Sequence, residues 1–238
     1  MIDTLLSIVK PIDAPGSIPF LLLALAVGLV LRLGWRRTRT IGRNWLVAVV
    51  IGYGVLALPI VANGIAGGLA GAKLITAPDL DSLDALVVFD GDNRRGRVRT
   101  ASELFARFHP HVVWVLGGEP EWLRDELPAG GVPSAMIRMD QSTKNTRDQV
   151  NWVARYRTSD PQSRFAIVVS RLQVTRVAGL VARLAPPIPL VGAPIDDEPP
   201  TRGAALFVPT YIALRVSRDA LYEHAALAYY RSRGWIAR

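Results

Sequence analysis

The sequence predicts an α/β fold: a doubly wound, mainly parallel sheet with helices on both faces, preceded by a hairpin of two apolar helices. Two observations predict it. Two long runs without a charged residue lie within the first 72 residues, and the rest of the chain alternates short apolar runs with helical stretches. Such alternation is typical of a parallel sheet whose strands are connected by helices.

We interpret residues 1–72 as a membrane anchor. Residues 14–31 carry no charge, and residues 44–72 form a second run of 29 uncharged residues. Because a helix of about 20 apolar residues crosses the hydrocarbon core of a bilayer, we predict transmembrane helices at about residues 14–33 and 45–68. A cleaved signal peptide is the alternative for the first run. It fits poorly, since the residues before that run are not basic.

The segment between the two runs, residues 32–43, contains five arginines and no acidic residue. Short loops rich in arginine stay on the cytoplasmic side of a membrane. We therefore expect a cytoplasmic loop at residues 32–43 and an extracytoplasmic domain over residues 73–238, with the lipid bilayer as a partner of the chain.

The distribution of charge bears on nucleic-acid binding. The chain has 28 Lys and Arg against 20 Asp and Glu, a net charge of +8, which by itself suggests a nucleic-acid partner. Half of this excess lies in residues 1–72, so we predict no nucleic-acid partner. The chain has no cysteine, which excludes a disulfide scaffold and a thiolate zinc site.

Five strands and five helices are expected in the second domain. The strands are predicted at residues 85–89, 112–116, 135–139, 165–169 and 188–191. The helices are predicted at residues 101–108, 121–127, 147–156, 172–184 and 211–231. Most of the strand runs are apolar throughout, as expected for a sheet that is covered on both faces.

Polar turns follow four of the predicted strands. They are Asp90-Gly91-Asp92, Gly117-Gly118-Glu119, Asn145-Thr146 and Ser170-Arg171. Because ligands of open α/β sheets bind at the carboxyl ends of the strands, these turns define the candidate site. A cluster of arginines follows the first turn, at positions 94, 95, 97 and 99, and suits phosphate or carboxylate. The alternative for Arg94 and Arg95 is a solvated basic loop.

The order of these motifs resembles a known family. The residues that carry the resemblance are the two apolar N-terminal runs, Gly117-Gly118, Gly131-Val132-Pro133, Ser142-Thr-Lys-Asn145-Thr146, Val168-Val-Ser170 with Arg176, and a tail from Val208-Pro209 to Gly234-Trp235. Together they resemble the YdcF/SanA/ElyC family (domain of unknown function 218), most of all its ElyC-type branch. The resemblance implies a Rossmann-like domain anchored in the bacterial inner membrane and facing the periplasm. It also implies a role in envelope biogenesis, connected with peptidoglycan or the undecaprenyl lipid carrier.

One motif departs from the family pattern. The family has Ser-x-x-His-x-x-Arg after its fourth strand, whereas this chain has Ser170, Gln173 and Arg176 at those positions. A side chain able to move a proton is therefore missing. Ser170-x-x-Gln173 also fits a helix capping box, as do Thr146-x-x-Gln149 and Thr100-x-x-Glu103.

The candidate site residues follow from the turns and the resemblance. We assign ligand binding to Gly91, Arg99, Gly117, Gly118, Asn145, Thr146, Ser170, Gln173 and Arg176. Asp90 and Glu119 are the candidate catalytic residues, because carboxylates at strand ends serve as acids or bases. We predict no metal site, and the sequence names no cofactor.

These observations give two expected functions. The first is an envelope protein whose extracytoplasmic domain binds an anionic small molecule or lipid-linked intermediate that bears phosphate, with hydrolysis or group transfer as an open question. The second is a non-catalytic regulator or assembly factor that works with envelope-synthesis proteins and has lost the family's histidine. DNA or RNA binding is a third class, and it requires the basic residues to lie in the cytoplasm.

Overall fold

The computed structural model describes residues 16–34, 36–69, 81–185 and 188–236. The chain forms two compact units, which we describe separately. The first comprises the residues up to Gly68 together with Asp197–Ala225, and the second comprises Leu69–Asp196 together with the residues from Ala226 onward. Helix α9 (Tyr211–Ser232) contributes to both units. The predicted domain boundary at residues 72 and 73 lies outside the described residues.

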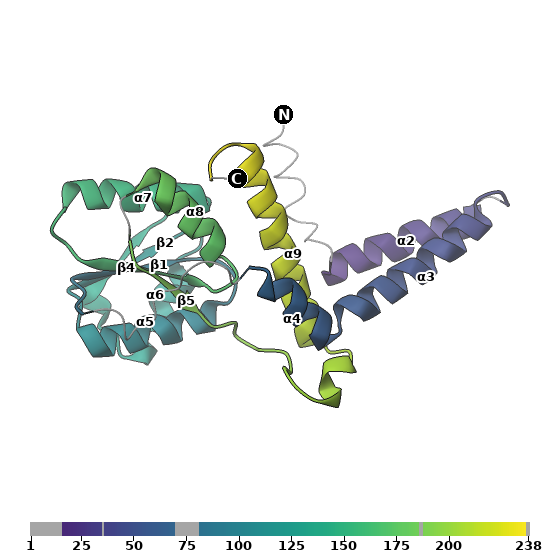
Figure 1. Ribbon diagram of the computed structural model, residues 1–238, viewed down its shortest axis with the longest axis horizontal. Coiled ribbons are helices and arrows are strands. Elements are labelled where there is room, and N and C mark those ends of the chain that lie inside the picture. Colours follow the sequence, from purple (N-terminus) through teal and green to yellow (C-terminus); the bar gives the residue numbers. More distant parts are fainter. Residues whose placement is uncertain (1–15, 35, 70–80, 186–187, 237–238) are drawn as a thin grey trace. The chain divides into compact units, whose positions relative to one another are not determined.

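The second unit contains the predicted parallel sheet (Figure 1). Its five strands are β1 (Ala85–Phe89), β2 (Val112–Leu116), β3 (Ile137–Asp140), β4 (Phe165–Ser170) and β5 (Leu190–Ala193). All neighbouring strands are parallel, in the order β3-β2-β1-β4-β5. The α/β fold class is thus confirmed, and so are the five strands.

The register brings the carboxyl ends of the central strands to one edge. Ala85, the first residue of β1, pairs with Val112 of β2 and with Phe165 of β4. Every residue of β1 and β4 is buried, as their runs of β-branched and aromatic side chains predict. Because the three strands begin in line, the turns that follow them lie at the same edge of the sheet.

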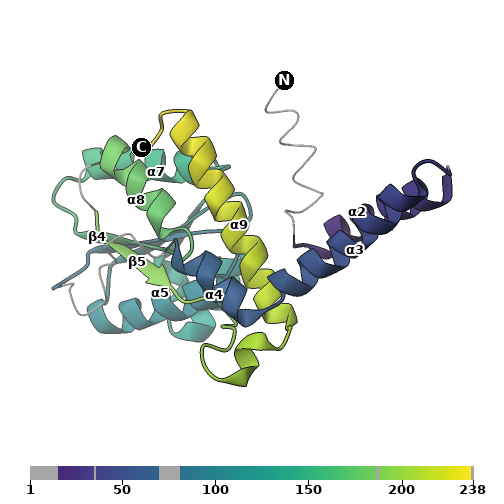
Figure 2. The same ribbon diagram turned by 45° about the vertical axis from the view of Figure 1, so that its right-hand side comes forward.

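Helices cover both faces of the sheet. Helices α5 (Arg94–Phe108) and α6 (Glu121–Glu126) lie on one face, and α7 (Thr146–Ser159) and α8 (Val174–Leu184) lie on the other (Figures 1 and 2). On the first face, Leu104 and Phe105 of α5 pack against Leu86, Val88 and Val115 of the sheet. This packing fixes α5 on the sheet, and its amino-terminal end follows the turn after β1.

The end of the chain packs on α7 and α8. The guanidinium carbon of Arg147 lies 4.3 Å from the ring centroid of Trp235. Gly179 in α8 lies against Ile236, where a Cβ on the glycine would be 3.0 Å from Cγ2 of Ile236. The tail from Ala226 onward is therefore an integral part of the second unit.

The first unit begins with a hairpin of helices α2 (Ile18–Gly34) and α3 (Arg39–Leu56). The helices approach closely at two glycines: a Cβ on Gly42 would lie 2.7 Å from the carbonyl oxygen of Gly28. The indole N–H of Trp45 donates to the Ala24 carbonyl at 2.8 Å. The loop predicted at residues 32–43 is shorter than expected, since three of its arginines lie within the two helices, Arg32 in α2 and Arg39 and Arg43 in α3.

The second predicted membrane helix is broken. Helix α3 ends at Leu56, and α4 (Pro59–Gly67) leaves at an angle of 72°. The cause is Pro59, which occupies the first turn of α4 and holds the preceding Leu58 in an extended conformation. A continuous helix over residues 45–68 is therefore not found.

The remaining contacts of the first unit tie α9 to these helices. Ser217 of α9 donates to the carbonyl of Leu56 at 2.8 Å, and Thr210 donates its N–H to the carbonyl of Ala57 at 2.8 Å. A ring nitrogen of His224 lies 3.0 Å from the carbonyl oxygen of Ile65. The first two bonds satisfy carbonyls at the break between α3 and α4, and the third satisfies a carbonyl in the last turn of α4.

Among the described helices, none is by itself both long and apolar enough to span a bilayer. The bent pair α3 and α4 reaches the required length and composition together, and α2 is apolar but has 17 residues. The transmembrane hairpin therefore stays a prediction.

Candidate functional site

The strand order places a crossover between β1 and β4. The chain moves from β1 through β2 to β3 on one side of the sheet, and from β4 to β5 on the other. In open α/β sheets the crevice at the carboxyl ends of two such strands is the usual ligand site. Asp90 and Gly91 follow β1, Ser170 is the last residue of β4, and Gln173 lies in the turn after it.

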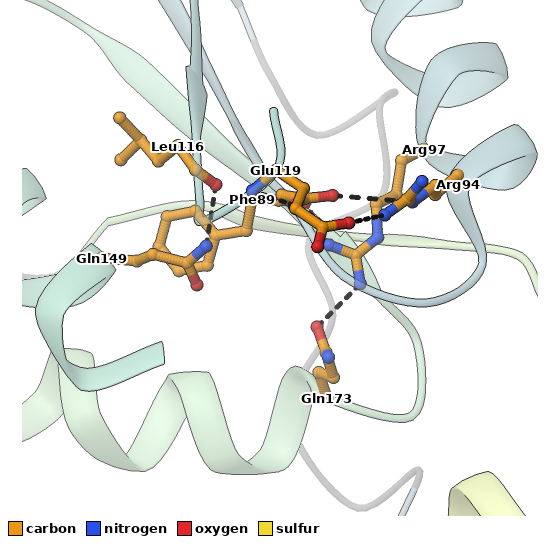
Figure 3. A network of polar contacts seen from close by, with 8 residues as sticks. Phe89, Arg94, Arg97, Leu116, Glu119, Gln149 and Gln173 are labelled. Carbon is orange, nitrogen blue, oxygen red and sulfur yellow. Dashed lines mark hydrogen bonds and ion pairs between the residues drawn. The ribbon is translucent and has the colours of Figure 1, made fainter. Parts of the chain in front are cut away.

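A buried arginine links these two turns. Arg97 of α5 is 0% exposed, and its guanidinium donates to the Phe89 carbonyl at the end of β1 and, at 2.9 Å, to Oε1 of Gln173 (Figure 3). Gly91 lies beside this pair with φ 141°, and a Cβ there would lie 3.1 Å from Nη2 of Arg97. The positive φ and the close guanidinium both favour glycine at position 91.

Arg97 was not among the predicted site residues. The sequence places it in a basic cluster that lacks a helical pattern of apolar residues, and the helix was expected only from residue 101. Helix α5 in fact begins at Arg94, so this cluster is not a loop. One signal that points to Arg97 is its distance of one helical turn from Asn93, a residue type that favours helix starts.

A set of charged side chains lies at the ends of β1 and β2. Asp90 accepts the N–H of Glu119 on Oδ2 at 3.2 Å, and its Oδ1 lies 3.8 Å from Nε of Arg94. Nη2 of Arg94 also lies 3.4 Å from the Glu119 carboxylate (Figure 3). The Asp90 side chain is 8% exposed, whereas that of Glu119 is 83% exposed. The two predicted catalytic carboxylates are thus brought together through one arginine.

The amino-terminal end of α5 is held by side chains from other parts of the unit. Asn93 adopts the left-handed conformation, with φ 59° and ψ 50°, and donates to Oγ of the buried Ser170 at 3.4 Å. The Asp196 carboxylate accepts the N–H of Gly96 at 2.7 Å. A carboxylate of the chain itself therefore occupies the dipole end of α5.

Thr146 and Arg176 form an internal contact. Asn145, and not Thr146, caps helix α7, since its side chain accepts the N–H of Asp148 at 3.0 Å. Thr146 accepts a hydrogen bond from Nη1 of Arg176 at 2.6 Å. Arg176 is 4% exposed, and its guanidinium carbon lies 5.5 Å from the ring centroid of Tyr230. These contacts give Arg176 a packing role between α7, α8 and the tail.

The three proposed capping boxes are wrong. Helix α8 begins at Val174, so Ser170 lies too early to cap it, and Gln173 at the cap position makes no capping bond. Gln149 instead donates to the Leu116 carbonyl at 2.8 Å (Figure 3). Thr100 and Glu103 lie inside α5, because that helix begins six residues earlier than Thr100.

Arg99 lies apart from the strand-end turns. It pairs with Glu103 one turn along α5 at 3.0 Å, and both side chains are exposed. With Trp122 it lines a groove of about 460 Å³ between α5 and the segment of α6 and η2 (Leu127–Gly130).

Among the predicted ligand-binding residues, the structure brings Gly91, Gly117, Gly118, Ser170 and Gln173 to the strand-end edge.

A carboxylate that the sequence did not single out lies at the end of β3. Asp140 accepts hydrogen bonds from the hydroxyl and the N–H of Ser142, and from the indole N–H of Trp152 at 2.8 Å. The bond from the Ser142 hydroxyl is the main reason why the pKa of Asp140 lies below its usual value. Trp152 stacks on Tyr156, with ring centroids 5.3 Å apart. Asp140 thus links the segment before α7 to Trp152 in the middle of that helix.

At the strand-end edge, Arg97 and Gln173 provide hydrogen-bond donors near β1 and β4. The carboxylates of Asp90 and Glu119 lie near the ends of β1 and β2. Within the described residues, no group of three or more His, Cys, Asp or Glu side chains is placed to hold a metal ion. Comparisons of the chain with protein-family models, with curated proteins and with solved structures found no match in any of the three.

Proposed function

We propose that the chain is a membrane-anchored protein of the bacterial envelope whose second unit binds an anionic, phosphate-bearing ligand at the crossover between β1 and β4. The observation that carries the proposal is the meeting of Gly91, Gln173 and the buried Arg97 at this point. A turn without a side chain lets a ligand approach the backbone, and the guanidinium beneath it supplies positive charge in a region of low dielectric.

Helix α8 adds to the attraction for an anion. Its 11 residues start directly after Gln173, whose side chain makes no capping bond. The N–H groups of the first turn and the helix dipole favour negative charge at this end. The amino end of α5 already accepts Asp196, so the two helices at the crossover differ in this respect.

Membrane attachment is supported by the side chains of the hairpin. Helices α2 and α3 expose large apolar side chains, among them Leu22 (61%), Val30 (69%), Leu33 (77%), Val50 (61%) and Ile51 (58%). Contiguous apolar surface of this kind marks a membrane or protein contact. We propose insertion in the inner membrane with the arginines of residues 32–43 in the cytoplasm and the second unit in the periplasm.

A reporter fusion tests this orientation. Alkaline phosphatase, which is active only outside the cytoplasm, is fused after Arg238, and a cytoplasmic reporter is fused at the same position in a matched strain. We expect only the alkaline phosphatase fusion to be active. The opposite result would place the basic residues of the second unit in the cytoplasm and would favour nucleic-acid binding.

The ligand class is tested on the purified full chain in detergent. Phosphate, pyrophosphate and a polyprenyl phosphate are titrated separately by calorimetry. Binding of all three supports a site for the phosphate group, and binding of the polyprenyl phosphate alone supports a lipid-linked ligand of the kind that the family resemblance implies. Absence of binding for all three would refute the proposed ligand class.

A non-catalytic role is the second candidate, and Gln173 is the observation that favours it. A carboxamide neither gives nor takes a proton at ordinary pH, so the chain has no acid or base where the family has histidine. Asp90 and Glu119 remain as candidate acid and base groups. Release of phosphate from pyrophosphate by the wild-type chain, abolished in Asp90→Asn, would establish catalysis. Absence of release, with binding retained, favours a regulator that acts on envelope-synthesis proteins.

A further inference from the structure

The side-chain amide of Gln173 has a fixed orientation. A guanidinium carries only hydrogen-bond donors, so the atom of Gln173 that faces Nη2 of Arg97 at 2.9 Å must be the amide oxygen. The NH2 group must then point away from Arg97. It lies toward the turn after β1, 3.5 Å from the position that a Cβ on Gly91 would occupy.

The NH2 group of Gln173 has no hydrogen-bond partner among the described residues, and the side chain is half-buried. Arg97, in contrast, is fully buried, and its bond to the Phe89 carbonyl holds it at the end of β1. The buried Arg97 therefore sets the orientation of the more accessible Gln173 side chain. The result is a pair of neutral N–H donors directed at the crossover.

We propose that Arg97 is a positioning residue, which holds the Gln173 amide with its NH2 group toward the ligand. The site thereby selects ligand groups that present unprotonated acceptor oxygens, such as tetrahedral oxyanions. This inference rests on the proposed function, because it specifies how that site recognises its ligand. Over the physiological pH range the Arg97 guanidinium stays charged and the Gln173 amide stays neutral. The site rejects ligand groups that present N–H or O–H toward Gln173.

The decisive variant is Gln173→Glu, tested in the full chain in detergent with sulfate as the probe. Sulfate has the geometry of phosphate and stays fully ionised. The substitution keeps the size of the side chain and gives Arg97 a carboxylate partner, so the melting temperature should be unchanged or higher. Both N–H donors are lost and a negative charge is added, so sulfate affinity should fall by about tenfold or more. The matched control is Gln162→Glu, which adds the same charge at an exposed position before β4 and should leave the affinity unchanged.

A spectroscopic measurement tests the positioning role of Arg97. In chain labelled with 15N at glutamine side chains, the NH2 signals assigned to Gln173 by their loss in Gln173→Glu should shift on sulfate titration. In Arg97→Lys the fork that fixes the amide is absent, so these signals should shift less at saturation and the affinity should fall.

The outcomes separate this inference from the proposed function. If wild-type chain binds none of sulfate, phosphate, pyrophosphate and the polyprenyl phosphate, the proposed function fails and the inference fails with it. If wild-type chain binds sulfate and Gln173→Glu binds it equally well, the inference is overturned while the proposed function stands. Should Arg97→Lys not fold, the Gln173→Glu and Gln162→Glu pair decides alone.

Discussion

Gly117 packs directly against the side chain of Asp90. A Cβ atom on Gly117 would overlap the Cβ of Asp90 and lie 3.0 Å from its Oδ2 atom. The turn after β2 can therefore reach the end of β1 only because residue 117 has no side chain. This approach also places the N–H of Glu119 on the Asp90 carboxylate.

Gly117→Ala should consequently destabilise the chain. An added methyl group has to displace Asp90 or the backbone, and overpacking of this kind costs about 1–3 kcal/mol. For a unit of this size that corresponds to a loss of roughly 2–10 °C in melting temperature. Thermal unfolding followed by circular dichroism measures the loss.

Gly118→Ala is the matched control for this prediction. Gly118 is the next residue of the same turn, it is exposed, and a Cβ there meets nothing within 4 Å. Its melting temperature should stay within about 1–2 °C of the wild type, as for a surface change of about 0.5 kcal/mol. Equal melting temperatures for the two variants would show that the close approach of Gly117 to Asp90 is not rigid.

Arg176→Ala should act on stability before it acts on any ligand. The substitution leaves Thr146 without its bond from Nη1 and removes the guanidinium from the ring of Tyr230. Loss of a buried, hydrogen-bonded charged side chain costs about 2 kcal/mol or more, so the melting temperature should fall by roughly 4 °C or more. The control is Arg183→Ala, an exposed residue of the same helix, which should be nearly neutral. A stable Arg176→Ala variant that no longer binds phosphate would contradict the packing role and would make Arg176 a ligand contact.

The central strands and most helix starts could be predicted from the sequence, and the start of α5 could not. The expected strands at residues 85–89 and 112–116 match β1 and β2. Continuous runs rich in β-branched residues favour strands, so these two could be recognised from the sequence. The start of α5 depends instead on Asp196, which lies 100 residues away and accepts the N–H of Gly96. No local pattern contains that contact.

The same distinction applies to the candidate site. The turns at residues 91, 117 and 118 follow recognisable strands, so the sequence placed them at the correct edge. Arg97 and Arg99 belong to one basic cluster and differ by two residues, yet one is buried at the crossover and the other lies in the groove beside α6. Two residues apart on a helix means about 200° apart around its axis, so the two side chains point in nearly opposite directions. The cluster is largely polar, and its sequence therefore does not indicate that it is helical.

The stability contributed by Asp140 should depend on pH. Its carboxylate accepts bonds from Ser142 and Trp152, and these lower its pKa in the folded chain. A group whose pKa is lowered by folding contributes stability that is present above the unfolded value, about 3.9, and is lost as the pH falls through the folded value. Asp140→Asn should therefore lower the melting temperature at pH 7, by roughly 2–4 °C for a loss of about 1 kcal/mol.

The comparison of wild type and Asp140→Asn is repeated at several pH values between 7 and 3. The difference in melting temperature should shrink toward the acidic end, because the wild-type carboxylate is then protonated as well. A difference that does not change with pH would mean that the carboxylate charge contributes nothing to the anchoring of α7. The indole bond of Trp152 gives a second readout, since loss of Asp140 should shift the tryptophan emission.

The close packing of the hairpin predicts a difference between two glycines of α3. A Cβ on Gly42 would lie 2.7 Å from the Gly28 carbonyl oxygen and 2.8 Å from Cα of Arg32, so Gly42→Ala forces α2 and α3 apart. Gly54 lies on the same helix, and a Cβ there meets nothing within 4 Å. Both substitutions gain the same helix propensity, about 1 kcal/mol, so their difference isolates the contact between the helices. We expect Gly54→Ala to be neutral or stabilising and Gly42→Ala to melt several degrees lower, as measured on the full chain in detergent. If both variants melt at the same temperature, the two helices do not pack at Gly42 as the structure describes.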